Sequence, residues 1–327
     1  MATRIGFLLF PGFPMACLTS VIEPLRAANE ISETSRFEWL LLSEAGEKVV
    51  SSAGIAFEPD GCLDTVGALD FVILLSAPGA RFDNPRSASQ LRRIDRHGAT
   101  LGAISGGVFP LVRSGVVRAE RLSVHWCYEA AFAAEFPEID RSKEVIEISG
   151  RRITASGAAA AFEVALRLID TALGPNVADE VACWFQHPML RKAGVRQTLP
   201  VRQIPEADLS PLVTRAIALF AEDLASPASV ADIAAHLNIS PRHLERSFKQ
   251  STGQSPTAYF RHLRMRAARQ IVMYTNDDIA DVAAAVGYAT AKPFVKQYRA
   301  AFGLSPQADR KRINLYRVEG NLPVPSV

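Results

Sequence analysis

Residues 229–256 read SVADIAAHLNISPRHLERSFKQSTGQSP, and residues 278–306 read DIADVAAAVGYATAKPFVKQYRAAFGLSP. Each stretch starts with a capping residue, Ser229 or Asp278, and has an acid three positions later. Apolar residues lie at the i, i+3, i+4 and i+7 spacing of a helix face. After a short turn, a Ser or Thr can cap a second helix, which ends at a Gly-x-Ser-Pro sequence where glycine suits the left-handed position. The two stretches therefore predict a duplicated helix-turn-helix.

Between the two motifs, residues 257–274 carry apolar side chains at helical spacing, which predicts one connecting helix that holds the motifs at a fixed separation. The second helix of each motif is rich in hydrogen-bond donors, which reach base edges and phosphates when a helix lies in a major groove. The candidate DNA-contacting residues are Arg242, His243, Arg246, Lys249 and Gln250 in the first motif, and Thr290, Lys292, Lys296, Gln297 and Arg299 in the second.

Charge is unevenly distributed along the 327 residues, whose formal net charge is only +2. Residues 240–312 contain thirteen Lys and Arg against five Asp and Glu, a net of +8, so the rest of the chain carries −6. A basic C-terminal part on an acidic N-terminal part is typical of a nucleic-acid-binding domain joined to a different domain. A solvated helical face is the alternative interpretation of the basic charge, and the internal repeat disfavours it.

The cysteines and the apolar segments exclude several classes of protein. Four cysteines are scattered without CxxC spacing, at Cys17, Cys62, Cys127 and Cys183. They indicate neither a metal site nor a disulfide framework, and the sequence predicts no cofactor. The apolar run at residues 5–10 is too short to cross a membrane. We therefore expect a cytoplasmic protein without a membrane partner.

From residue 4 to about residue 174, short apolar runs alternate with helical patterns, which indicates a parallel sheet covered by helices. The predicted strands are Ile5–Phe10, Phe37–Ser43, Phe71–Ser76, Thr100–Ile104 and a hairpin of Val145–Ser149 with Arg152–Ala155. The predicted helices are Met15–Asn29, Ser87–His97, Val108–Arg113, Trp126–Glu135, Ala158–Leu173 and Val177–Phe185. The expected fold class is α/β, a parallel-sheet sandwich, followed by an all-α domain with two helix-turn-helix motifs.

Ligands of open α/β sheets bind at the carboxyl ends of the strands, so the residues that follow each strand are site candidates. One predicted strand runs directly into a Ser-Gly-Gly sequence and then into a helix, which is the pattern of a nucleophile elbow. His125 and Trp126 lie next to each other further along the chain, and Glu23 lies on the first predicted helix. The ligand-site candidates are therefore Ser105, Gly106, Gly107, His125, Trp126 and Glu23.

Residues from about Leu212 to Arg312 resemble the AraC/XylS-type DNA-binding domain. The resemblance lies in Ala267, Ile271, Ile279-x-x-Val282-Ala283, Gly287-Tyr288, Phe294, Tyr298, Gly303 and Ser305-Pro306. Pro293 departs from the family pattern, but it falls in the first turn of its helix, where no intrahelical N–H bond is lost. The resemblance implies binding to promoter DNA and action on RNA polymerase.

Residues from about Ile5 to Leu173 resemble the class I glutamine amidotransferase-like fold of the PfpI superfamily, whose working site combines an elbow Cys, a His and a helix Glu. Ser105, His125 and Glu23 stand at these three positions. The whole chain resembles regulators that fuse this domain to an AraC-type one and respond to amino acids or to quaternary amines such as carnitine and glycine betaine. The resemblance also implies a homodimer formed through the N-terminal domain.

A serine at the elbow leaves a second function open. Enzymes of the superfamily use a thiolate, whereas a serine needs a general base, and His125 could serve as that base in an amidase or hydrolase. Ser105, His125 and Glu23 could also each have a purely structural role. The expected function is a sequence-specific transcriptional regulator, not an enzyme, with a small amino-acid-like or quaternary-amine effector bound to a catalytically inactive domain.

Four segments are expected along the chain. Residues 1–190 form a ligand-sensing and dimerisation domain, 191–209 a linker, 210–312 the DNA-binding domain and 313–327 a tail. The linker is assigned because glycine and prolines at positions 194, 200 and 205 interrupt regular structure.

Overall fold

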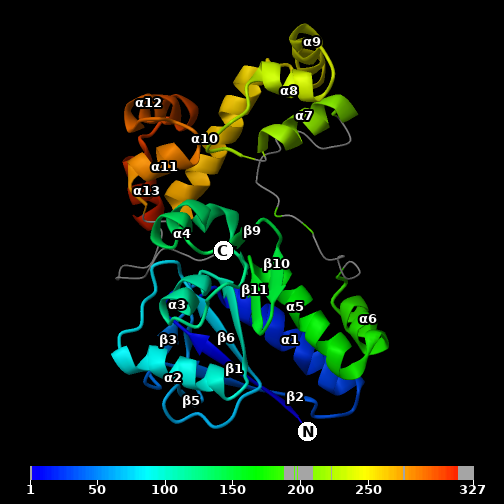
Figure 1. The fold of residues 1–327 in the computed structure, drawn as a ribbon, viewed down its shortest axis with the longest axis vertical. Helices are drawn as coiled ribbons and strands as arrows, with labels where there is room; N and C mark the ends of the chain where they lie inside the picture. Colours follow the sequence, from blue (N-terminus) through cyan, green and yellow to red (C-terminus); the bar gives the residue numbers. More distant parts are fainter. Residues whose placement is uncertain are drawn as a thin grey trace. The chain divides into compact units, whose positions relative to one another are not determined.

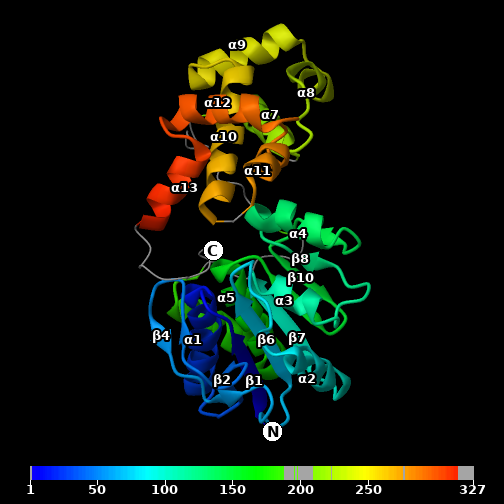
Figure 2. The same cartoon turned by 90° about the vertical axis from the view of Figure 1, so that its left-hand side faces the viewer.

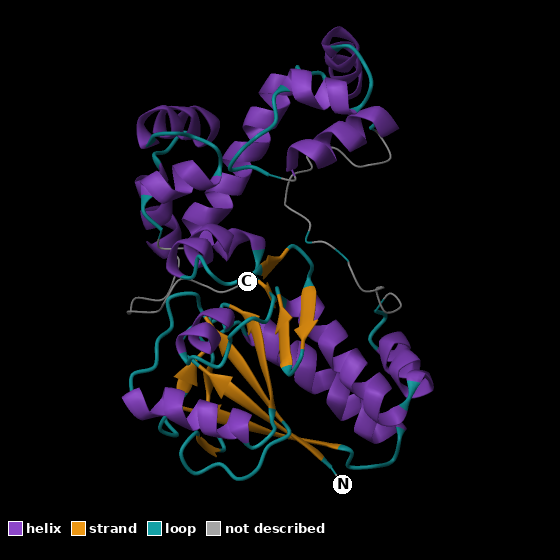
Figure 3. Cartoon of the chain, viewed as in Figure 1, coloured by secondary structure: helices purple, strands orange, loops and turns teal. Residues whose placement is uncertain are grey.

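The computed structural model describes residues 2–187, 195, 197, 209–221, 223–274 and 277–315. The chain divides into two compact units, and the boundary falls between Gln197 and Thr198. Among the described residues, strands occur in the first unit, and the second consists of helices joined by turns (Figure 3). Most of the expected linker, and residues 316–327 of the expected tail, lie outside the described residues.

A seven-stranded sheet organises the first unit (Figure 1). Its order is β10-β11-β7-β6-β1-β2-β5, and all neighbours are parallel except β10 and β11, which form the expected hairpin. The strands are β1 (Thr3–Leu9), β2 (Phe37–Ser43), β5 (Gly61–Cys62), β6 (Phe71–Ser76), β7 (Thr100–Ser105), β10 (Ile146–Ser149) and β11 (Arg152–Ala155). The predicted parallel sheet is confirmed.

The short strand β5 of this sheet and two further pairs of very short strands were not predicted, because two-residue strands carry no periodicity. The two pairs are β3 (Val49–Val50) with β4 (Ala56–Phe57), and β8 (Leu122–Ser123) with β9 (Arg141–Ser142).

Helices cover both faces of the sheet, which confirms the α/β sandwich (Figures 1 and 2). One layer contains α1 (Met15–Ile31), α5 (Ala158–Leu173) and α6 (Pro175–Trp184), and the other contains α2 (Pro85–Arg96) and α3 (Val108–Arg113). The predicted helical stretch from Trp126 to Glu135 is confirmed, but it is not one continuous α-helix. A 3-10 turn, η1 (Trp126–Tyr128), precedes α4 (Glu129–Glu135), because the ring of His125 accepts the backbone N–H of Cys127 and tightens the start.

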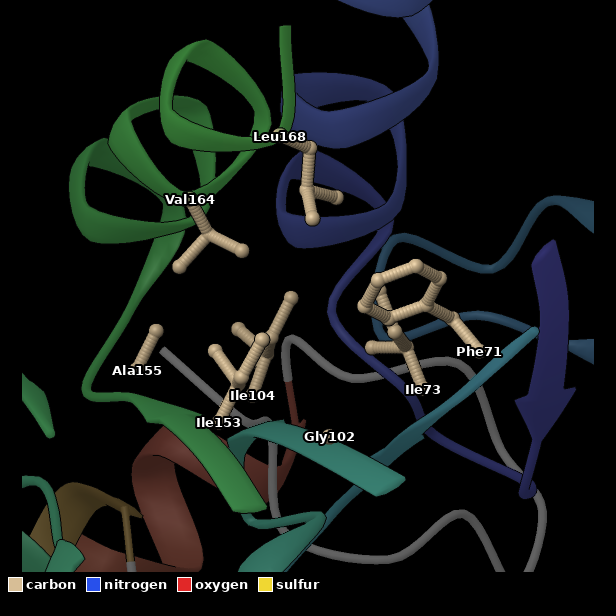
Figure 4. Close-up of a pocket in the computed structure, with 8 residues that line it drawn as sticks. All are labelled: Phe71, Ile73, Gly102, Ile104, Ile153, Ala155, Val164 and Leu168. Carbon is tan, nitrogen blue, oxygen red and sulfur yellow. The ribbon is translucent and has the colours of Figure 1, made fainter. Parts of the chain in front are cut away.

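The sheet is buried on both faces, as its apolar strands predict. Ile5, Phe7 and Leu9 of β1 pack in one core with α1, α5 and α6, while Leu8, which points the other way, is also fully buried. A cavity of about 10 Å³ remains between α5 and the sheet (Figure 4). It is lined by Phe71, Ile73, Gly102, Ile104, Ile153, Ala155, Val164 and Leu168. This apolar space is at the lower limit for a single water molecule, so it is a packing defect and not an effector site.

The second unit consists of two helical cores that share one long helix. The first half of that helix packs with α7, α8 and α9, and its second half packs with α11 and α12. The helices are α7 (Pro211–Ala221), α8 (Val230–His236), α9 (Pro241–Thr252), α10 (Pro256–Tyr274), α11 (Ile279–Ala285), α12 (Ala291–Phe302) and α13 (Pro306–Leu315). The predicted duplicated helix-turn-helix and the connecting helix α10 are therefore confirmed.

The helix ends differ between the two motifs. Ser229 forms a capping box with Asp232, and Ser240 caps α9 through the His243 N–H, as the sequence predicts. Asp278 and Thr290 occupy the matching positions before α11 and α12, but neither side chain makes a capping hydrogen bond. Caps on the second motif therefore contribute less to its stability than caps on the first.

The glycine that ends each second helix has the predicted conformation. Gly253 and Gly303 have φ values of 73° and 76°, in the left-handed region that glycine adopts without steric cost. Pro293 is the third residue of α12 and leaves the helix intact, as predicted.

We expect Ser229→Ala to lower the free energy of unfolding of the second unit by about 1 kcal/mol, because the N–H of Asp232 loses its acceptor. Thr290→Ala is the matched control, since Thr290 caps no N–H. Thermal unfolding followed by circular dichroism measures both. Equal losses in the two variants would contradict the role of the capping box.

Candidate ligand site and DNA-binding surface

The elbow at the end of β7 has the geometry that the sequence predicts. Ser105 is fully buried and has a φ of 57°, a left-handed conformation that non-glycine residues rarely adopt. It lies at the carboxyl edge of the sheet, in register with Ser76 at the end of β6. Neither hydroxyl has a hydrogen-bond partner among the described residues. Strained backbone and an unpaired buried hydroxyl together mark this edge as a candidate site.

The two glycines after Ser105 are required by close backbone packing. A Cβ on Gly106 would collide with the Ser76 carbonyl oxygen, and one on Gly107 would collide with the Leu74 carbonyl oxygen. The N–H of Gly107 is also occupied, because it donates to the Ile104 carbonyl at 3.0 Å. Gly107 therefore shapes the turn, and its N–H is not free to donate to a ligand.

His125 follows β8 and is partly buried beside the rings of Trp126 and Tyr128, whose centroids lie 5.5 Å and 5.6 Å from its own. Its Nδ1 lies 2.9 Å from the Cys127 Sγ and accepts the Cys127 N–H at 3.3 Å. Burial lowers the pKa of the ring from 6.5 to about 4. The ring is therefore neutral at pH 7, and the acceptor role of Nδ1 assigns its proton to Nε2.

The structure does not pair Ser105 with His125. The Ser105 hydroxyl has no hydrogen-bond partner within the described part of the chain, and the lone pair of His125 Nδ1 faces Cys127. A serine nucleophile needs a base within hydrogen-bond reach. The geometry therefore gives no support to the alternative of a Ser105–His125 hydrolase.

Glu23 lies on α1 with its carboxylate about half exposed. Arg26 donates to that carboxylate at 3.0 Å from Nε and also to Glu30 at 2.7 Å from Nη1. No hydrogen bond or ion pair between described residues connects Glu23 with Ser105 or His125. Glu23 is therefore not an isolated acid, because it shares the Arg26 guanidinium with Glu30.

Gln197 is a residue that the sequence assigned to the linker, yet its side chain contacts the His125 segment. Its Oε1 accepts the Trp126 N–H at 2.8 Å, and its Nε2 donates to the Val124 carbonyl at 2.7 Å. Its own N–H donates to the Lys143 carbonyl at 2.8 Å. We call the two side-chain hydrogen bonds the Gln197 bridge. Local sequence carries no signal for it, because its partners lie more than seventy positions earlier in the chain.

The second helix of the first motif, α9, is oriented by Leu244 and Phe248, which are fully buried. Its predicted DNA-contacting residues are all exposed, namely Arg242, His243, Arg246, Lys249 and Gln250. A hollow of about 780 Å³ on this helix is lined by Ser240, Arg242, His243, Glu245, Arg246, Lys249 and Ser255. Glu245 was not among the residues predicted from the sequence, because those were chosen as hydrogen-bond donors and a carboxylate is an acceptor.

The second helix of the second motif, α12, is oriented in the same way by the buried side chains of Phe294 and Tyr298. Of its predicted DNA-contacting residues, Gln297 is partly buried, and the others, Thr290, Lys292, Lys296 and Arg299, are exposed. Both helices therefore present basic side chains on the face opposite their own core.

Two arginines of α10 have structural partners. Arg264 donates to the carbonyls of Val286 and Gly287 at 2.6 Å each and lies 4.1 Å from the ring centre of Tyr288, which fixes the turn of the second motif. Arg269 pairs with the buried carboxylate of Asp309 at 2.8 Å. These two positive charges stabilise the fold and are not free for phosphates.

Asp309 also joins α12 to α13. The Tyr298 hydroxyl donates to its carboxylate at 2.8 Å, and burial together with this hydrogen bond raises the pKa of the phenol. The carboxylate thus holds α10, α12 and α13 together.

No three His, Cys, Asp or Glu side chains of the described residues are placed to hold a metal ion. Likewise, no helix that the structure describes is long and apolar enough to span a membrane.

The depressed pKa of His125 predicts a pH dependence. In the unfolded chain, His125 binds a proton with its ordinary pKa near 6.5, whereas in the folded chain it binds one only near pH 4. Because protonation then favours the unfolded state, the stability of the first unit should fall as the pH drops from about 6.5 to about 4. We expect a loss of about 2 kcal/mol, reduced for partial solvent access. Urea unfolding at a series of pH values measures it. His125→Asn should flatten that part of the curve, and parallel curves for the two proteins would contradict the assignment.

Comparison with known proteins agrees with this two-part structure. The model of the DJ-1/PfpI family matches residues 4–171, and a model described as a helix-turn-helix domain matches residues 233–312. The crystal structure of an AraC family transcriptional regulator from Pseudomonas putida covers 56% of this chain and 99% of its own, with 24% identity and a TM-score of 0.50, which shows a shared fold.

Relatives match over nearly the whole chain. The HTH-type transcriptional regulator GbdR of Pseudomonas aeruginosa is 31% identical over 322 residues, 98% of this chain and 88% of that protein. The HTH-type transcriptional regulator CdhR of the same species is 32% identical over 312 residues, 95% of this chain and 92% of that protein. The chain therefore belongs to the DNA-binding transcriptional regulators that join a DJ-1/PfpI family domain to an AraC-type helix-turn-helix domain.

Proposed function

We propose that this regulator acts in the cytoplasm under the control of a small effector, an amino acid or a quaternary amine, which its first unit binds without catalysis. The Gln197 bridge is the observation that carries the proposal. It joins the backbone on both sides of His125 to the residue at which the chain leaves the first unit. An effector that moves the His125 segment must also disturb the start of the chain that leads to the DNA-binding unit.

We propose that Ser105, His125 and Trp126 contribute to one site that suits a zwitterionic amine. The neutral ring of His125 leaves its Nε2–H as a donor for a carboxylate, and the Ser105 hydroxyl is a second polar group without an internal partner. The face of Trp126 can attract a cationic nitrogen through its π electrons. We include Ser105, His125 and Trp126 in the site, with Gly106 and Gly107 as the residues that shape its turn, and we leave out Glu23.

We expect at least one of glycine betaine, carnitine and arginine to raise the melting temperature of the full chain. A ligand at a hundredfold excess over its dissociation constant adds roughly 3 kcal/mol to the stability of the domain that binds it. Trp126→Leu should abolish the shift for a quaternary amine. Ser105 is a poorer position for a test, because its side chain is fully buried and a substitution there would also perturb the fold.

Glu23→Gln is the matched control for the effector test, since this carboxylate is already paired with Arg26. We expect the variant to keep the full thermal shift. A shift that survives Trp126→Leu but not Glu23→Gln would place the site at α1 instead. No shift with any of the three compounds would reject the proposed effector class.

The proposed DNA contacts are the donors of α9 and α12. The shared helix α10 sets the spacing of the two motifs, so we propose that one protomer contacts successive major grooves about 34 Å apart on one face of the duplex. We further propose that the bound regulator acts on RNA polymerase, which transcription in vitro with purified polymerase would measure.

We also propose a homodimer formed through the first unit. Trp184 at the end of α6 is 56% exposed, a large apolar side chain on a helix that packs against α1 and α5. Sedimentation of the full chain at micromolar concentration measures the assembly, and a monomer would reject it.

The Gln197 bridge should determine how strongly effector and DNA binding influence each other. We expect Gln197→Leu to leave the thermal shift in place but to reduce the effector-dependent change in affinity for a promoter fragment at least fivefold, because the bridge is lost. Gln186→Leu is the control, since among the described residues the Gln186 side chain bonds locally to the Cys183 carbonyl. Full coupling in Gln197→Leu would show that the signal leaves the first unit by another route.

A further inference from the structure

We propose that Glu245 is a specificity-determining residue of the first motif, and that its carboxylate reads cytosine by accepting a hydrogen bond from the N4 amino group in the major groove. Carboxylates pair with cytosine N4 in this way, whereas arginine and lysine prefer guanine. The proposal rests on DNA binding by the first motif and adds a residue that a search for donors passes over.

The fold places Glu245 on the DNA-binding face of α9. It directly follows Leu244, whose side chain is fully buried in the core of the first motif, and it is itself exposed. Together with Arg242 and Arg246 it lines the hollow on this helix. Residues near the N-terminus of a recognition helix are the ones that contact base edges, and Glu245 is the fifth residue of α9.

The Glu245 carboxylate has no partner within the described residues of the protein. Lys249 lies four positions later, the spacing and direction that favour an ion pair on a helix surface, and Arg242 lies three positions earlier. Neither forms an ion pair with Glu245 in the structure, and no hydrogen bond to its side chain is present among the described residues. The acceptor is therefore available to a donor from outside the chain.

An acid on this face is unfavourable for binding through phosphates. Arg242, Arg246 and Lys249 surround it, and a negative charge among them weakens the attraction that all three exert on the DNA backbone. A direct contact with a base edge accounts for an acid at this place, because it exchanges some general affinity for discrimination between base pairs.

The internal repeat provides a comparison within the same chain. Leu244 and Phe248 of α9 correspond to Phe294 and Tyr298 of α12, and this register aligns Glu245 with Val295. Val295 is partly buried against the core of the second motif and carries no hydrogen-bonding group. The packing of the motif therefore does not require an acid at this position. The two motifs should differ in the base that they prefer opposite Glu245 and Val295.

The experiment selects bound duplexes from a random library with the full chain. For wild type we expect one position of the enriched sequence to be cytosine. Glu245→Gln should change that position to adenine, which an amide recognises through N6 and N7, with a roughly ten- to hundredfold change in relative affinity. Glu245→Ala should lose preference at this position alone. Because the side chain is exposed, neither variant should lower the melting temperature.

Lys249→Ala is the control for a phosphate contact. It should weaken binding to all sequences alike and reduce the slope of log affinity against log salt by about 1, without changing the enriched sequence. An identical enriched sequence from wild type, Glu245→Gln and Glu245→Ala would overturn the proposal. If wild type enriches no sequence at all, the assignment of α9 as a base-reading helix fails as well.

Discussion

The two helix-turn-helix motifs depend on one shared helix. α10 contributes Tyr259, Phe260 and Leu263 to the first core and a later set of side chains to the second, so neither motif can bury its apolar face without it. Phe260 stacks on Phe220 of α7 with ring centres 3.8 Å apart. Because α10 is a single helix, the separation of α9 and α12 is set by its length and not by a flexible connection.

The same helix explains why positive charge is a poor guide to DNA contacts in this unit. Arg264 and Arg269 are committed to the turn of the second motif and to the buried carboxylate of Asp309. A guanidinium that binds backbone carbonyls or a buried acid cannot move to a phosphate without leaving those partners unpaired. The net positive charge of the second unit is therefore larger than the positive charge that is available to DNA phosphates.

In the first unit, a strained turn lies at the carboxyl edge of the sheet, and a bridge from distant sequence holds the backbone beside His125. Ser105 has a positive φ and is followed by glycines packed against the β6 backbone, and burial keeps His125 neutral while its Nδ1 accepts the Cys127 N–H. The arrangement leaves polar groups unpaired without aligning a nucleophile and a base. Such a site suits recognition of a ligand better than chemistry on it.

The sequence by itself determined the longer strands and helices, the duplicated motif, the elbow and the exposed faces of α9 and α12, but not the two-residue strands or the strand order of the sheet. These features rest on periodicity, caps and glycine positions, which act over about ten residues and can be read locally. Only the tertiary structure decided what each polar group bonds. It paired Glu23 with Arg26, turned His125 Nδ1 toward Cys127, and brought Gln197 to the backbone beside Trp126. The reason is physical: a hydrogen bond depends on distance in space, and no short-range pattern encodes a partner seventy residues away.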